Sequence, residues 1–168
     1  VGKYFDPAKV NVVNVAIGGR SSRTFITEGR WAATLSMMKR GDFVIIQFGH
    51  NDGGPLNDDS RARGSIRGTG TATEAIDNLL TKKPEVVRTY GAYLRQYLAD
   101  ARAKGATPYL CTQVPRKMWE AGEARIGRPS DGTVVWARQV AEAEEATLLD
   151  LHEAVAASYD ALGREAVE

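Results

Sequence analysis

Residues 43–52 read Phe-Val-Ile-Ile-Gln-Phe-Gly-His-Asn-Asp, an apolar run of strand-forming residues that ends in four small or polar ones. Such a run is typical of a buried strand in a parallel sheet, and its polar end marks where the strand opens into a loop. Enzymes with parallel α/β sheets bind their ligands at these strand ends. Asn51 can aim its side-chain N–H there at an oxygen on which negative charge develops. The stretch therefore predicts an α/β fold and indicates acyl transfer.

Further strand and helix patterns alternate along the rest of the chain. Besides residues 43–48, we expect strands at 10–17, 107–113 and 146–151, and helices at 28–39, 85–104, 133–145 and 151–162. This alternation predicts a parallel sheet with helices on both faces. Residues 53–83 carry many glycines and few large apolar residues, so we expect a long loop that leaves the Asn51 corner and faces a substrate.

Composition restricts the class of protein. The 168 residues fit one domain, and 22 Lys plus Arg against 21 Asp plus Glu give a net charge of +1. A balance of this kind gives no reason to expect nucleic acid or a membrane surface as partner. Cys111, the one cysteine, lies in an apolar run and is expected to be a buried core residue. No apolar run approaches the roughly 18 residues of a membrane span.

A second polar corner follows the first expected strand. Residues 17–23 read Ile-Gly-Gly-Arg-Ser-Ser-Arg, and the glycines would let backbone N–H groups approach a phosphate or an oxyanion. The lysine and spacer of a Walker A sequence are missing. The alternative is a tight strand-to-helix connection with Ser22 as the helix cap.

Histidines and acidic residues near the first corner raise the question of a metal site. His50 and Asp52 are candidates for hydrogen-bonding support of the site or for metal ligation. The other histidine is His152, and no carboxylate cluster lies near either histidine in the sequence, so we expect no metal.

Together the two corners resemble the SGNH (GDSL-type) hydrolases and, within them, the rhamnogalacturonan acetylesterase branch. Residues 14–25, 28–31, 41–42, 47–54, 89–95, 104–106 and 114–119 carry the likeness, which covers nearly all of the chain. The resemblance implies a flavodoxin-like three-layer α/β/α sandwich with a parallel sheet. It also implies hydrolysis of an acyl ester by a Ser-His-Asp triad, without metal or organic cofactor. Gly19 matches the glycine whose backbone N–H joins the family's oxyanion hole, and Asn51 matches the asparagine whose amide joins it.

Two blocks of the family pattern have no counterpart in this sequence. The nucleophile block, Gly-Asp-Ser, is expected upstream of Gly19, and the Asp-x-x-His block is expected beyond the last helix. Asp150-Leu151-His152 is one residue short, so we interpret it as a strand-terminal aspartate and a helix-start histidine. Ser21 and Ser22 have no general base in view. We therefore expect a single SGNH hydrolase-like domain over residues 1–168, truncated at both ends, that lacks the first strand and the C-terminal block and is inactive alone.

The family implies an acetylated pectic backbone rich in uronic acid. Guanidinium groups suit sugar carboxylates, and the loop cations that qualify are Arg20, Arg23, Arg61, Arg63, Arg67, Arg116 and Lys117. The alternative for each is a solvated loop surface. Trp119 is expected either to stack on a sugar ring or to cover the edge of the core. We predict substrate contacts from Arg20, His50, Arg116 and Trp119.

Partners and competing functions complete the expectations. We expect an acetylated acidic polysaccharide or a small acyl ester as ligand, a monomer, and a parent protein that is secreted or periplasmic. A non-catalytic carbohydrate-binding or scaffolding protein of the same fold is the alternative, for which a missing triad is natural. A nucleotide- or phosphate-binding flavodoxin-like module is a third hypothesis, based on the Gly18-Gly19 turn alone.

Overall fold

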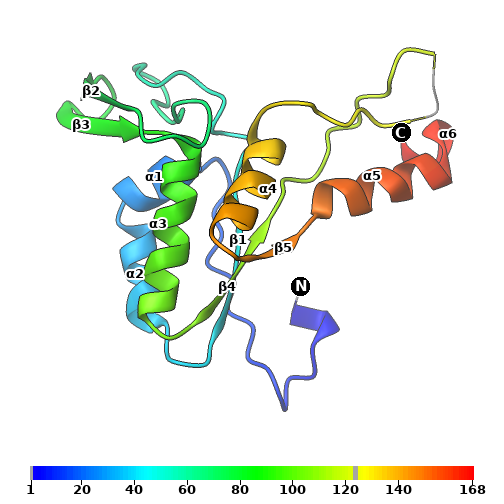
Figure 1. The fold of residues 1–168 in the computed structure, drawn as a ribbon, viewed down its shortest axis with the longest axis horizontal. Helices are drawn as coiled ribbons and strands as arrows, with labels where there is room; N and C mark the ends of the chain where they lie inside the picture. Colours follow the sequence, from blue (N-terminus) through cyan, green and yellow to red (C-terminus); the bar gives the residue numbers. More distant parts are fainter. Residues whose placement is uncertain (1, 123–124) are drawn as a thin grey trace.

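A three-stranded parallel sheet forms the centre of the molecule in the computed structural model, which describes residues 2–122 and 125–168 (Figure 1). Its strands are β1 (Phe43–Gln47), β4 (Thr107–Cys111) and β5 (Thr147–Leu149), in the order β1-β4-β5. Ile45 lies opposite Tyr109, and Tyr109 lies opposite Thr147. The predicted α/β class with a parallel sheet is confirmed.

Four helices pack against one face of this sheet. They are α1 (Ser22–Thr27), α2 (Arg30–Met37), α3 (Tyr90–Ala103) and α4 (Thr133–Ala143). A 3₁₀ turn, η1 (Gly2–Tyr4), opens the described chain, and α5 (Leu151–Leu162) and α6 (Arg164–Val167) lead away from the sheet (Figure 1). The boundaries of α5 are those predicted, because Asp150 caps its start and Gly163 follows its end with φ of 79°.

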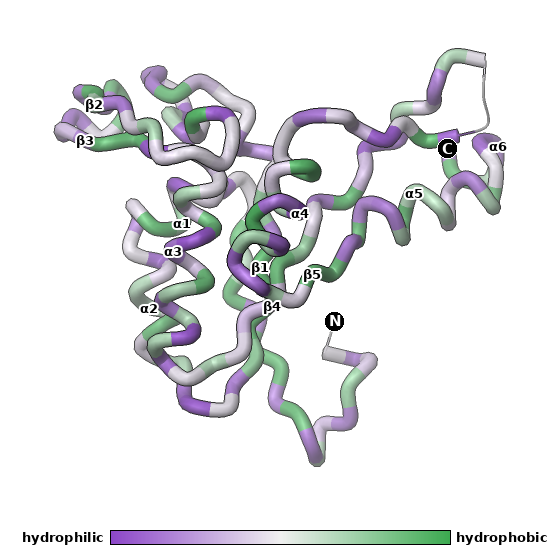
Figure 2. Tube along the Cα trace, in the orientation of Figure 1, coloured by the Kyte–Doolittle hydropathy of each residue, from purple (hydrophilic) through white to green (hydrophobic). Residues whose placement is uncertain are grey.

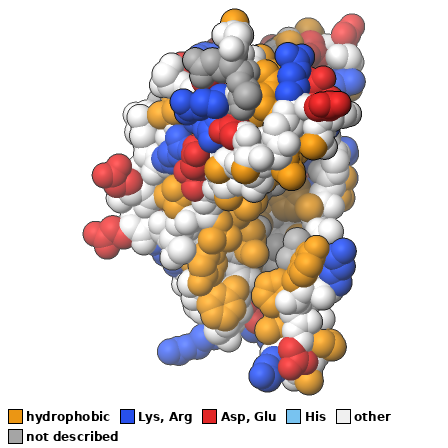
Figure 3. All heavy atoms as spheres, turned by 90° about the vertical axis from the view of Figure 1, so that its right-hand side faces the viewer, with side chains coloured by type: hydrophobic (Ala, Val, Ile, Leu, Met, Phe, Trp, Pro, Cys, Tyr) orange, Lys and Arg blue, Asp and Glu red, His pale blue; other side chains and the backbone are white. Residues whose placement is uncertain are grey.

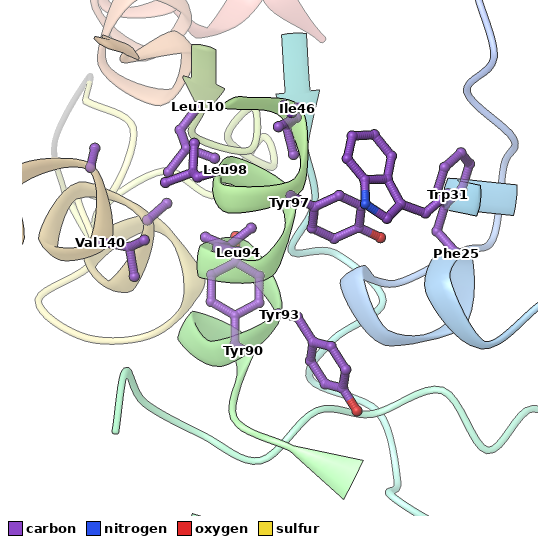
Figure 4. Packing of buried hydrophobic residues seen from close by; sticks show 13 residues of the cluster. Phe25, Trp31, Ile46, Tyr90, Tyr93, Leu94, Tyr97, Leu98, Leu110 and Val140 are labelled. Atoms are coloured by element: carbon purple, nitrogen blue, oxygen red, sulfur yellow. The ribbon is translucent and has the colours of Figure 1, made fainter. Parts of the chain in front are cut away.

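The core is centred on α3 (Figure 4). Tyr97 packs on one side against Trp31, with ring centroids 4.7 Å apart, and against Phe48 at 5.1 Å. Leu98 faces Leu110 of β4 on the other side (Figure 4). Figure 2 shows hydrophobic residues concentrated along the strands of the sheet. The amphipathic pattern of α3 thus places one aromatic and one aliphatic cluster around a single helix.

The opposite face of the sheet is exposed. Phe43 and Ile45 of β1 keep 71% and 55% of their surface accessible. Figure 3 shows hydrophobic side chains gathered around a hollow on this side of the molecule. Parallel sheets are normally covered on both faces. The described residues therefore form two layers of the expected three-layer sandwich: the sheet and the helices on one of its faces.

The predicted first strand at residues 10–17 is wrong. This segment pairs with no strand among the described residues, and Val13 is 63% exposed, although Val15 packs against the core. β-branched residues favour extended backbone, but a strand forms only where a neighbouring strand accepts its hydrogen bonds. Propensity alone could not supply that neighbour.

Three other predicted segments differ from the structure. The expected loop over residues 53–83 contains β2 (Thr73–Asn78), which pairs antiparallel with β3 (Lys83–Arg88). The helix predicted from Glu85 starts at Tyr90, because Glu85 joins the hairpin through bonds to Arg23 and Asn78. The helix predicted over 28–39 is α2 alone, separated from α1 at Gly29, whose φ is 75°.

Two compositional expectations can be compared with the structure. Cys111 is buried as predicted, and burial raises the pKa of its thiol to about 11. None of the helices among the described residues is both long enough and apolar enough to cross a membrane.

Candidate active site

Two loops meet where β1 ends and α1 begins. We call residues 49–52 the β1 corner and residues 18–20 the glycine turn. The amide Nδ2 of Asn51 donates a hydrogen bond of 2.9 Å to the backbone oxygen of Arg20. The structure therefore brings the two sequence-predicted corners into direct contact, although 31 residues separate Arg20 from Asn51.

Glycine is required on both sides of this contact. Gly49 has a φ of 147°, and a Cβ atom there would lie 2.2 Å from Oε1 of Gln113. Gly19 has a φ of 79°, in the left-handed region that side chains other than glycine rarely adopt. The conformation of each loop thus depends on a glycine that the sequence places at the end of an apolar run.

Unused donors remain at the contact. Gly19 is exposed, and no described residue accepts a hydrogen bond from its backbone N–H. Asn51 is half-buried, and its amide has a second N–H that bonds to no described residue. Two free donors, one from each loop, therefore lie near the same contact and can serve an oxygen that acquires negative charge.

A buried carboxylate stands directly behind Asn51. Asp52 Oδ1 accepts hydrogen bonds from Ser22 Oγ at 2.5 Å, Ser65 Oγ at 2.6 Å and Ser22 N at 3.1 Å. Burial raises the pKa of this carboxyl, and the bonds from the two serines partly offset that effect. The alternative with Ser22 as the helix cap is wrong in its residue: the cap of α1 is Ser21, whose Oγ accepts from Thr24 N.

Arg20 and His50 lie at the contact, but their side chains are already engaged. The Nε of Arg20 donates to Glu28 Oε2 at 2.9 Å, and Arg30 donates to the same oxygen at 2.6 Å. The Nε2 of His50 donates to the backbone oxygen of Val114 at 3.1 Å and remains exposed. His50 thereby joins the β1 corner to the segment that follows β4.

The other two predicted substrate contacts lie on the segment after β4. Arg116 is exposed, while Trp119 is half-buried and pairs through a β-bridge with Ile126. Within the described part of the chain, no hydrogen bond or ion pair connects Arg116 or Trp119 to the β1 corner or the glycine turn. The geometry therefore brings Arg20 and His50 to the site and leaves the roles of Arg116 and Trp119 as predictions.

Arg23 does not lie on a loop surface, contrary to the expectation. It is fully buried and forms a two-bond ion pair with Glu85, at 2.7 Å for each bond. Its Nη1 donates to the backbone oxygens of Leu56 and Gly64. Arg23 thus fixes the loop after the β1 corner to α1 and to the β2–β3 hairpin, because four of its five N–H groups donate to oxygens of these segments.

Asp150 and His152 occupy the positions interpreted from the sequence. Asp150 accepts hydrogen bonds from Thr112 Oγ1 at 2.8 Å and from Glu153 N at 3.2 Å, and it pairs with Arg138. His152 is buried in the first turn of α5, and its Nδ1 has no partner among the described residues. No described serine hydroxyl bonds to a histidine. The pair is a helix cap and a helix-start histidine.

Sequence reasoning missed Ser65 and Tyr97, and it considered Arg63 only as a loop cation for sugar carboxylates. Ser65 binds Asp52 from the long loop, and Arg63 donates to the backbone oxygen of Gly19 at 3.2 Å. Tyr97 of α3 donates to the backbone oxygen of Ser22 at 2.8 Å. These residues lie 13 to 75 positions from their partners, and no local pattern marks them. Among the described residues, no group of three or more His, Cys, Asp or Glu could hold a metal ion.

Comparison with known proteins gives consistent matches. Residues 2–165 match the model of the GDSL-like Lipase/Acylhydrolase family. A rhamnogalacturonan acetylesterase of Emericella nidulans is 32% identical over 99% of this chain and 66% of its own length. A probable rhamnogalacturonan acetylesterase, YesY, of Bacillus subtilis is 35% identical over 96% of this chain and 63% of its own length.

A crystal structure supports the same fold. Protein YXIM of Bacillus subtilis superimposes with a TM-score of 0.73 over 97% of this chain and 39% of that protein, at 24% identity. The chain thus spans less than two thirds of the length of each of these relatives.

Proposed function

From the premise that this chain belongs to the GDSL-like lipase/acylhydrolase family, we propose that it contributes the oxyanion hole of a carbohydrate acetylesterase. The substrate is an acetylated, pectic polysaccharide of the rhamnogalacturonan type. The Gly19 N–H and the Asn51 amide stabilise the oxyanion that forms when a serine attacks the acetyl carbonyl. The serine and its Asp-His pair come from sequence outside residues 1–168.

One observation carries this proposal. The Asn51 amide and the glycine turn are joined by the 2.9 Å bond to Arg20, and each loop retains a free N–H beside that bond. Donors held before the reaction act on charge as it develops and need no reorganisation, which makes them effective in catalysis. A negatively charged tetrahedral intermediate suits this pair of donors better than a neutral ground-state carbonyl.

Support for the substrate class comes from the relatives. Two curated relatives at 32% and 35% identity are named rhamnogalacturonan acetylesterases. Arg20, His50, Arg116 and Trp119 are proposed to contact the polysaccharide. The exposed side chains of His50 and Arg116 lie on loops that follow β1 and β4, where an extended chain has access. Guanidinium and imidazole groups can bind its uronic acid carboxylates.

A non-catalytic carbohydrate-binding protein is the alternative. It is favoured by one finding, that the described residues hold no hydrogen-bonded Ser-His-Asp chain. Residues 1–168 alone are expected to show no turnover of a chromogenic acetate ester above buffer. Acetate release by the whole protein would exclude the alternative, whereas polysaccharide binding without acetate release would support it.

The decisive experiment measures acetate release by the whole protein from acetylated rhamnogalacturonan. Asn51→Ala is expected to lower kcat by about 10²–10³ with little change in KM, because the amide acts on the transition state. Asn57→Ala is the matched control, since Asn57 is also a half-buried asparagine whose Nδ2 binds a backbone oxygen, that of Asp77. Equal kcat values for Asn51→Ala and wild type would remove Asn51 from the proposed oxyanion hole.

A further inference from the structure

Asp52 is a buried carboxyl group that forms no ion pair with any described residue. Asp52 is only 3% exposed, and the hydrogen-bond partners of its side chain among the described residues are Ser22 and Ser65. Burying an aspartate costs free energy, and hydrophobic residues of similar size are often at least as stabilising. The stability of the fold therefore gives no sufficient reason for a carboxylate at this position.

Asp52 follows one donor residue of the candidate oxyanion hole, Asn51, and binds the segment that follows the other, Gly19. Asn51 binds the backbone of Arg20, and the next residue, Asp52, binds both the N–H and the hydroxyl of Ser22. Asn51 and Asp52, which are consecutive in the β1 corner, thus bind Arg20 and Ser22, which follow Gly19 in the chain. A shift of either loop would break both connections together.

One further bond to Ser22 and two bonds to its partner Asp52 restrict the movement of Ser22. Its backbone oxygen accepts a hydrogen bond from Tyr97 on the central helix α3, at 2.8 Å. Ser65 binds Asp52 through its hydroxyl at 2.6 Å and through its N–H to the Asp52 backbone oxygen at 2.9 Å. Ser22 is therefore fixed by its N–H, its hydroxyl and its carbonyl, and the glycine turn that precedes it is anchored to the core.

We propose that Asp52, acting through Ser22, is a positioning residue that sets the distance between the Gly19 N–H and the Asn51 amide. This inference rests on the proposed function, because the distance matters for catalysis only if both groups bind an oxyanion. Ser65, which donates to the same Oδ1 from the long loop, has the same role. A misplacement of about 1 Å in such a site can lower the rate by about 10².

The test compares kcat and KM for acetate ester hydrolysis by the whole protein. Asp52→Ala is expected to lower kcat by about 10²-fold with KM within about twofold, since the donors act in the transition state. Asp52→Asn keeps an acceptor where Oδ1 stands and is expected to recover kcat to within about fivefold of wild type. Ser65→Ala, which removes one of three short bonds to Oδ1, is expected to fall between the two.

Asp150→Ala is the matched control, because Asp150 also follows a strand and binds a hydroxyl and a backbone N–H at a helix start. Its kcat is expected to stay within about twofold of wild type. A merely structural Asp52 would lower the melting temperature and leave kcat unchanged in the temperature range where the variant is folded. That result, or an equal loss of kcat in Asp150→Ala, would overturn the inference.

A separate readout distinguishes failure of the positioning role from failure of the proposed function. If the wild type hydrolyses no acetate ester, the proposed function fails, and positioning is then measured by NMR of the Asn51 side-chain amide. Asp52→Ala should shift its two N–H signals and speed their exchange with solvent, because the bond to Arg20 is loosened. Unchanged Asn51 signals in Asp52→Ala would show that Asp52 does not position this amide.

Discussion

Two strand ends of the same sheet each place an aspartate against a helix start, and the two environments differ. Asp150, after β5, is partly exposed and pairs with Arg138 at 2.8 Å. Asp52, after β1, is buried and binds serines. Burial opposes ionisation of Asp150, but bonds from Arg138 and Thr112 leave its pKa below the usual range. Burial raises the pKa of Asp52.

The two aspartates therefore have different roles. Asp150 stabilises the fold, whereas Asp52 constrains the candidate site. Asp150 caps α5 and gains from its cation, as expected of a helix N-cap. Asp52 loses hydration without an opposite charge, yet it connects the β1 corner, the glycine turn and the long loop. Positions that constrain a site at a cost in stability are where functional residues are commonly found.

The largest effect is expected from removing the buried carboxylate. Asp52→Ala should lower the free energy of unfolding by about 3 kcal/mol, because a buried N–H and two hydroxyls lose their acceptor and each unsatisfied group costs ~1–3 kcal/mol. The hydroxyls of Ser22 and Ser65, 3.4 Å apart, can offset part of this loss by pairing. Urea denaturation measures the change.

Asp150→Ala provides the comparison. It should lower the free energy of unfolding by only about 1 kcal/mol, the typical contribution of an N-cap, because its ion pair is partly exposed and adds little. Equal losses of unfolding free energy in Asp52→Ala and Asp150→Ala would contradict this distinction between the two aspartates.

An effect between those of Asp52→Ala and Asp150→Ala is expected from separating the long loop from the β1 corner. Gly64 precedes Ser65, and a Cβ atom at Gly64 would lie 2.0 Å from the backbone oxygen of Gly54. Gly64→Ala should therefore lower the free energy of unfolding by about 2 kcal/mol through overpacking, measured in urea. Gly53→Ala is the control, since a Cβ atom there meets no atom within 4 Å. Equal stability of the two variants would show that the loop moves freely.

The smallest effect concerns pH. As pH falls, His152 and Asp52 should change the stability of the fold in opposite directions. Burial, and next Arg138, lower the pKa of His152 below its ordinary 6.5, so the unfolded chain binds the proton more tightly. This contribution to stability is complete above pH 6.5 and is lost as pH falls below it. Asp52 has a raised pKa, so its effect is opposite: stability increases as pH falls through the range between its folded pKa and 3.8.

Thermal denaturation from pH 7.5 to 4 would separate these contributions. His152→Gln should reduce the loss of stability below pH 6.5, and Asp52→Asn should remove the opposing gain at lower pH. Unchanged pH profiles in both variants would show that neither group changes its pKa on folding.

Local patterns in the sequence were sufficient for much of the fold. The apolar run predicted as a strand over residues 43–48 became β1 at Phe43–Gln47, and α5 has its predicted bounds, with Gly163 directly after its end. The contact between the Asn51 corner and the glycine turn also followed from the sequence, through the resemblance to a known family. Asn51 and Gly19 were identified because each stands at a recognisable change from apolar to small or polar residues.

The remaining features depended on partners far away in the chain. Residues 10–17 have the composition of a strand but no paired neighbour, and Glu85 left a helical pattern for a hairpin in which Arg23 and Asn78 bind it. Arg23 looked like a loop cation, yet four hydrogen bonds satisfy it in the interior. Neither periodicity nor composition records which distant group will satisfy a charge.

The sequence by itself determined the α/β class, most helix and strand positions and the family, because these depend on periodicity, glycine placement and short motifs. Only the tertiary structure decided that Asp52 and Ser65 lie behind the glycine turn and that Arg23 is buried. The physical reason is that burial and hydrogen-bond satisfaction are properties of the packed chain, set by groups that meet only after folding.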